Sequence, residues 1–81
     1  MKIYKIRFNS VEEIKDFVRI ISDYDFTADI KCGQYSVDAY SLLGLFTISI
    51  KKDIYLVIYR YEDENKLSEF LEKIKFVLIK K

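Results

Sequence analysis

The segment from Tyr35 to Leu71 constrains the fold more than any other part of this chain. Its apolar residues alternate, then take helical spacing, then alternate and take helical spacing again, with no proline and a single glycine. Alternation predicts a half-buried strand, and apolar residues three or four apart predict an amphipathic helix. The segment therefore predicts a strand, a short helix that starts at a serine, a second strand and a long helix.

Four stretches of the chain show the alternation of a half-buried strand. They are residues 2–8, 26–31, 35–39 and 54–59. Gly33 lies between the second and third stretches, and glycine adopts the positive φ that a tight hairpin turn needs. We therefore expect these two strands to pair as an antiparallel hairpin.

Three stretches show helical spacing, and each begins with residues suited to a helix N-terminus. Ser10, followed by Glu13, is a capping-box pattern for a helix that ends near residues 23–25. Ser41 starts a short helix over residues 42–46. The acidic run 62–64 precedes the last helix, where the helix dipole favours negative charge. The apolar stripe of the first helix is Val11, Ile14, Phe17, Val18 and Ile21, and that of the last is Leu67, Phe70, Leu71, Ile74, Val77 and Leu78.

The resulting order is βαββαβα, which predicts an α+β open-faced sandwich with four strands and three helices on one face of the sheet. Eighty-one residues leave no room for a second core, so we expect a single domain over residues 1–81. The composition is 51% hydrophobic, which is enough for a folded core.

Composition also excludes several kinds of function. The net charge is +1 and the basic residues are spread along the chain, whereas nucleic-acid binding needs a clustered basic face. Cys32 is the only cysteine and there is no histidine, so we expect no disulfide, no metal site and no cofactor. The first residues, MKIYKIRF, mix charge and apolarity and do not resemble a signal peptide or a membrane span. A soluble cytoplasmic protein without membrane association is expected.

The chain resembles HPr, the histidine-containing phosphocarrier of the sugar phosphotransferase system, in element order and in three local sequences. Phe17 and Val18 fall where the family's first helix often has Phe-Val. The sequence YSLLG at 40–44 is similar to the family's Lys-Ser-hydrophobic-hydrophobic-Gly, and YEDE at 61–64 is similar to its Gly-Glu-Asp-Glu. Residues 35–71 align without gaps. The resemblance implies an HPr-like sandwich whose first and fourth strands are neighbours.

The chain departs from this family at the phosphotransfer site. Counting back from Phe17, Ser10 falls at the family's histidine position, Glu12 at its arginine and Glu13 at its proline. A phosphocarrier needs the labile phosphoryl bond that imidazole forms and a serine ester does not, with cationic and N–H groups around the anion. The two carboxylates would instead repel phosphate. We therefore predict no catalytic residue and no histidine phosphotransfer, with Ser10 acting as a helix cap; a phosphocarrier that uses another residue is poorly supported.

The resemblance also implies a regulatory role for Ser41. In many bacterial relatives the aligned serine is phosphorylated by a dedicated kinase, and some relatives without the histidine keep this serine and act only as regulators. The alternative is that Ser41 is simply an N-cap. Tyr40 replaces the lysine that usually precedes this serine.

An apolar partner-binding patch is implied at Leu42, Leu43 and Phe46, which share one side of the short helix, whereas Leu45 and Ile48 would turn into the core. The alternative is that all five side chains are buried.

A second exposed apolar surface is predicted on the open face of the sheet. If alternate residues of the first and fourth strands face the helices, the remaining ones face away and are adjacent. They are Ile3, Tyr55, Val57 and Tyr59. Such a patch is typical of an interface, and Lys5 and Arg7 would border it. We expect weak self-association across a two-fold axis; the alternative is a monomer with solvent-exposed tyrosines.

Together these observations favour a non-catalytic HPr-like domain, not an enzyme, that binds a protein partner or regulates one. The first alternative is a structural or self-associating module that retains only the fold. A small-molecule-binding domain is also compatible with the architecture, but the chain lacks a glycine-rich ligand loop.

Overall fold

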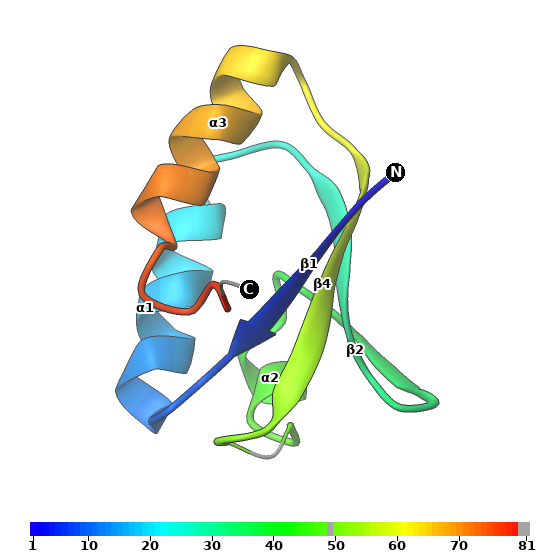
Figure 1. The fold of residues 1–81 in the computed structure, drawn as a ribbon, viewed down its shortest axis with the longest axis vertical. Coiled ribbons are helices and arrows are strands. Elements are labelled where there is room, and N and C mark those ends of the chain that lie inside the picture. Colours follow the sequence, from blue (N-terminus) through cyan, green and yellow to red (C-terminus); the bar gives the residue numbers. More distant parts are fainter. Residues whose placement is uncertain (49, 80–81) are drawn as a thin grey trace.

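The computed structural model describes residues 1–48 and 50–79, and it has the predicted order of elements. These are β1 (Lys2–Arg7), α1 (Val11–Ile21), β2 (Thr27–Cys32), β3 (Tyr35–Asp38), α2 (Leu42–Leu45), β4 (Asp53–Arg60) and α3 (Glu64–Lys73). The four strands pair antiparallel in the order β1-β4-β2-β3. The helices lie on one face of this sheet and the other face is open (Figure 1). The α+β open-faced sandwich is therefore confirmed.

Each helix starts at a side chain that accepts a hydrogen bond from its first turn. The Ser10 hydroxyl accepts from the Glu13 N–H of α1, and the Ser41 hydroxyl accepts from the Gly44 N–H of α2. Within the acidic run before α3, Asp63 is the cap, and its carboxylate accepts from the Lys66 N–H at 2.8 Å. These bonds satisfy N–H groups that have no partner inside the helix.

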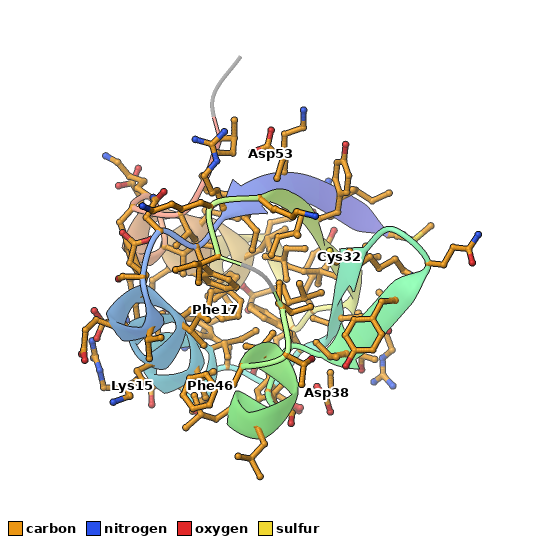
Figure 2. The ribbon with its side chains drawn as sticks, turned by 90° about the horizontal axis from the view of Figure 1, so that it is seen from below. Lys15, Phe17, Cys32, Asp38, Phe46 and Asp53 are labelled. Atoms are coloured by element: carbon orange, nitrogen blue, oxygen red, sulfur yellow. The ribbon has the colours of Figure 1, made fainter. Side chains whose placement is uncertain are left out.

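The core is a single layer of apolar side chains between the helices and the sheet. Its centre is aromatic, and Figure 2 shows Phe17 directed into it from α1. The Phe17 ring packs edge-on against Phe8, with ring centroids 5.4 Å apart, and against Phe70 of α3. Edge-to-face pairs stabilise by about 1 kcal/mol beyond the area they bury. The aromatic cluster thus joins both long helices to the end of β1.

The β2–β3 hairpin has the expected tight turn. Cys32 pairs with Tyr35, and Gly33 between them has a φ of +63°. A two-residue hairpin loop needs this left-handed conformation, which glycine adopts without a steric penalty.

The end of the chain differs from the expected helix. α3 stops at Lys73, and residues 74–79 turn back along the outer edge of β1. The Arg7 N–H donates to the Val77 carbonyl, and the Ile79 N–H donates to the Lys5 carbonyl, both at 2.9 Å. This path buries Val77 and gives the β1 edge hydrogen-bond partners that a longer helix would leave unpaired. Val77 and Leu78 therefore belong to this returning segment and not to a helix face; Lys80 and Lys81 lie outside the described residues.

Candidate functional site

The N-terminus of α1, where the resemblance places the phosphotransfer site, is closed by the chain's own side chains. Ser10 is extended, and its Oγ accepts the Glu13 N–H at 3.2 Å. The Glu13 carboxylate reaches back and accepts the Asn9 N–H at 2.8 Å. This is a capping box in which the carboxylate binds the N–H one residue before the cap. The serine and the glutamate thus have complete structural roles.

The charge at this helix end is negative. Glu12 is exposed, and its carboxylate lies 3.9 Å from the Lys15 ammonium one turn later in α1. Together with Glu13 it places two carboxylates in the first helical turn. They interact favourably with the positive end of the helix dipole and oppose the approach of a further anion.

Ser41 is a half-buried N-cap whose packing depends on Gly44. The Ser41 Oγ accepts the Gly44 N–H at 3.0 Å. A Cβ at position 44 would lie 3.0 Å from this Oγ and 3.3 Å from the Val37 Cβ. Glycine at this position therefore allows the serine cap and β3 to approach α2 closely.

Tyr40, beside this serine, has a structural role that its sequence position does not reveal. Its hydroxyl donates to the Tyr24 carbonyl at 2.6 Å and accepts the Phe26 N–H at 2.9 Å. Both partners lie in the loop between α1 and β2, so the two hydrogen bonds of the tyrosine connect the start of α2 to that loop. Burial raises the pKa of the Tyr40 hydroxyl above its ordinary value, and the hydrogen bond from Phe26 offsets part of this increase. No periodicity in the sequence indicates this contact.

The side chains of α2 divide between the core and solvent. Leu45 and Ile48 are buried, as expected. Leu43 is 80% exposed and Phe46 is 42% exposed, whereas Leu42 is partly buried against the core. The alternative that all five are buried is therefore wrong, and the exposed part of the candidate patch consists chiefly of Leu43 and Phe46.

The first turns of α1, the helix beside α2, also carry exposed side chains. Figure 2 shows Phe46 on the side of α2 that is turned toward α1, the helix that carries Lys15, and the two helices are in contact. Val11, one helical turn before Lys15, is exposed, although its spacing placed it in the buried stripe of α1. Burial in this stripe begins at Ile14, so Val11, the first residue of α1, is not part of the core. We call Val11, Lys15, Leu42, Leu43 and Phe46 the α1–α2 surface.

The open face of the sheet carries the second predicted patch with one correction. Ile3 is 59% exposed, and Tyr55 and Tyr59 are also exposed. Val57 is only 3% exposed, so the exposure expected of it is wrong. It lies on the central strand β4 between Ile3 and Asp29, and the longer side chains around it cover its short one. It therefore forms the floor of this surface.

The described residues supply little for metal or redox chemistry. Cys32 is a free, half-buried thiol. In residues 1–48 and 50–79, no three histidine, cysteine or acidic side chains gather in a way that would hold a metal ion. Over the same residues, no helix has the length and apolar character needed to cross a membrane.

Comparison with known proteins relates the fold to a solved structure. No protein-family profile and no curated protein sequence matches this chain. The crystal structure of HPr-C-His from Thermoanaerobacter tengcongensis is similar, with a TM-score of 0.73 over 93% of this chain and 92% of that chain. The sequences are 16% identical, so the likeness concerns the fold and not its chemistry. The chain thus has an HPr-like fold, in a sequence that contains no histidine.

Proposed function

We propose that this chain is a non-catalytic HPr-like domain that binds a protein partner through the α1–α2 surface and carries no phosphoryl group. The observation that carries the proposal is the pairing of two features: the closed, acidic start of α1 and the exposed apolar side chains of the neighbouring α2. The cytoplasm is the expected compartment, since the single free thiol of Cys32 does not require an oxidising environment.

The start of α1 argues against phosphoryl transfer by its chemistry. The Ser10 hydroxyl is a weak nucleophile, and with no histidine in the chain it has no imidazole to act as its base. The N–H groups that would bind a phosphoryl anion include that of Glu13, which already donates to Ser10. Incoming phosphate would also meet the carboxylates of Glu12 and Glu13.

Exposure of the α2 side chains argues for binding. A solvent-exposed leucine and a half-exposed phenylalanine on one short helix offer apolar area, and burial stabilises a complex by about 25 cal/mol per Å². Phe46 is the C-cap of α2, and its side chain has only two rotatable torsions, so little side-chain entropy is lost when a partner covers it.

Phosphoryl transfer is tested directly by incubating the protein with radiolabelled phosphoenolpyruvate and a phosphotransferase enzyme I. We expect no label on this chain, while a histidine-bearing HPr in a parallel reaction becomes labelled. Stoichiometric, acid-labile label on this chain would overturn this part of the proposal.

The binding surface is tested by comparing proteins captured from the source cells by the wild-type chain and by a Leu43→Glu/Phe46→Glu variant. Both positions are solvent-exposed, so we expect the variant to fold, as circular dichroism would show. A Lys66→Glu variant, altered on the exposed side of α3, is the matched control. We expect the Leu43/Phe46 variant alone to lose the captured partner; unchanged capture by all three proteins would contradict this surface.

A regulatory function controlled at Ser41 is the second candidate. It is favoured by the position of this serine at the start of α2, directly beside the α1–α2 surface, where a phosphate would change the charge next to Leu43. Treatment with an HPr-directed serine kinase, followed by mass spectrometry, tests it. Phosphate at Ser41 would support this function, and phosphate elsewhere or none would leave this serine as a helix cap.

A further inference from the structure

The open face of the sheet has an order that sequence alternation alone does not show. Its side chains form two rows that run across all four strands. Each row consists of residues that lie directly opposite one another on neighbouring strands. The first row, from β1 to β3, is Lys5, Tyr55, Lys31 and Ser36. The second row is Ile3, Val57, Asp29 and Asp38. Both rows have an apolar or aromatic residue on the central strand β4.

The charges of the two rows are opposite. The first row carries two lysines, and the second carries two aspartates that lie opposite each other. Like charges in directly opposite positions are unfavourable. Asp29 accepts one long hydrogen bond, from the Ser36 hydroxyl at 3.4 Å, and within the described residues neither Asp29 nor Lys31 forms an ion pair. The face therefore has unpaired charges of both signs beside an apolar centre.

We propose that a second copy of this chain binds this face about a two-fold axis. The axis lies in the plane of contact between the two copies, parallel to the two rows and midway between them. Rotation about this axis places each row against the other row of the second copy. It also places each strand over the same strand of the second copy. Lys31 then lies over Asp29 of the second copy, and Tyr55 lies over the position of the covered Val57, between Ile3 and Asp29 of the second copy. Each contact occurs twice, because a two-fold interface is reciprocal.

The charges select this axis over its main rival. An axis parallel to β4 would also keep Tyr55 and Val57 at the centre. However, it would place β1 of one copy over β2 of the other. Lys5 would then lie over Lys31 of the second copy, which brings like charges together. Like-charge contacts across an interface are strongly unfavourable, so the arrangement that pairs Lys31 with Asp29 is preferred.

The size of the face predicts a weak complex. Four strands about 4.8 Å apart and about six residues long, at about 3.3 Å per residue, have a projected area of about 400 Å² on each copy, and the accessible surface of the face is somewhat larger. A standard stable interface buries about 800 Å² on each partner. The dimer therefore forms at high protein concentration and weakens with added salt, because its charge pairs are partly exposed. This inference is independent of the partner-binding function proposed for the α1–α2 surface.

Charge reversal tests the pairing by sedimentation equilibrium at high micromolar to millimolar protein. Asp29→Lys and Lys31→Asp each place like charges against each other in the dimer, so we expect each variant alone to associate about tenfold or more weakly than wild type. An equimolar mixture of the two variants restores both charge pairs, so the mixture should associate as wild type does. The doubly substituted Asp29→Lys/Lys31→Asp chain should associate alone, for the same reason.

Several outcomes would overturn the proposal. The proposal is wrong if the wild-type chain stays monomeric at the highest protein concentration. Stronger association of Lys31→Asp than of wild type would show the rival axis, in which this change relieves repulsion from Lys5. Failure of the mixture to associate, with both variants folded by circular dichroism and thermal unfolding, would show that Lys31 and Asp29 do not meet.

Discussion

Tyr40 joins two segments that the sequence separates, because its hydroxyl both donates and accepts a hydrogen bond in the loop after α1. Tyr40→Phe keeps the ring and removes both bonds, leaving the Phe26 N–H and the Tyr24 carbonyl without this partner. We expect a loss of about 1–3 kcal/mol in the free energy of unfolding, measured by urea denaturation.

Tyr35→Phe is the matched control for this change. Among the described residues the Tyr35 hydroxyl bonds the exposed Thr47 hydroxyl alone, at 2.7 Å, so its removal should lower stability by less than about 0.5 kcal/mol. Equal urea midpoints for wild type and Tyr40→Phe would show that the tyrosine hydroxyl does not secure the loop.

Substitution of Gly44 tests how closely the Ser41 cap packs against α2. Alanine favours a helix by up to about 1 kcal/mol relative to glycine, but its Cβ would lie 3.0 Å from the Ser41 Oγ. We expect Gly44→Ala to lower the free energy of unfolding by about 1 kcal/mol, because the serine must move from its capping position. In a double-mutant cycle, Ser41→Ala with Gly44→Ala should destabilise by less than the sum of the single changes. A stabilised Gly44→Ala chain would show that the cap adjusts freely.

At the scale of whole elements, the returning segment 74–79 is held by backbone bonds to β1 and by burial of Val77. Deleting residues 76–81 removes both. Burial of one valine contributes about 1.5–3 kcal/mol and each of the two hydrogen bonds about 0.5–1.5 kcal/mol, so we expect a loss of about 2.5–6 kcal/mol. Thermal or urea unfolding measures this change.

Hydrogen exchange separates this contact from general destabilisation. The Arg7 amide donates to the Val77 carbonyl, so it should be protected in the full chain and lose its protection first after the deletion. A chain that lacks only residues 80 and 81 is the control and should keep that protection. An Arg7 amide that exchanges freely in the full chain would contradict the pairing.

For the molecule as a whole, we expect two partly buried tyrosines to contribute to the response to alkaline pH. The pKa values of Tyr4 and Tyr40 are raised above the ordinary 10.0, chiefly by burial and secondarily, at Tyr4, by the Glu64 carboxylate. The unfolded chain therefore loses these protons at lower pH than the folded chain. Their contribution to stability is fully present below about pH 10 and is lost as the pH rises through the higher folded pKa values.

Urea denaturation across this alkaline range tests the sign. We expect the free energy of unfolding to fall above about pH 10, and to fall less steeply in a Tyr4→Phe/Tyr40→Phe chain. A free energy of unfolding that rises above pH 10, or an equal slope in the two chains, would exclude these tyrosines as the cause.

Local patterns in the sequence determined the elements and their caps. Alternation located β1 to β4, and Ser10 and Ser41 lie at the helix starts where their side chains predicted them. These features depend on neighbours within about four residues, which a sequence displays directly. The pairing of β1 with β4 was implied by the resemblance to HPr, and the pairing of β2 with β4 was not predicted. The choice of Leu42, Leu43 and Phe46 as a patch was likewise implied by that resemblance.

Only the tertiary structure decided the features that depend on distant contacts. Val57 has the alternation of an exposed residue, yet neighbours on β1 and β2 cover it. Val77 has helical spacing, yet it lies in a returning segment, because its carbonyl accepts a hydrogen bond from the edge of β1 and its side chain is buried in the core. The role of Tyr40 and the opposed charges of Lys31 and Asp29 likewise follow from strand register and chain reversal. Burial and hydrogen bonding across the fold outweigh local preference at these positions, because local preferences amount to about 1 kcal/mol or less per residue.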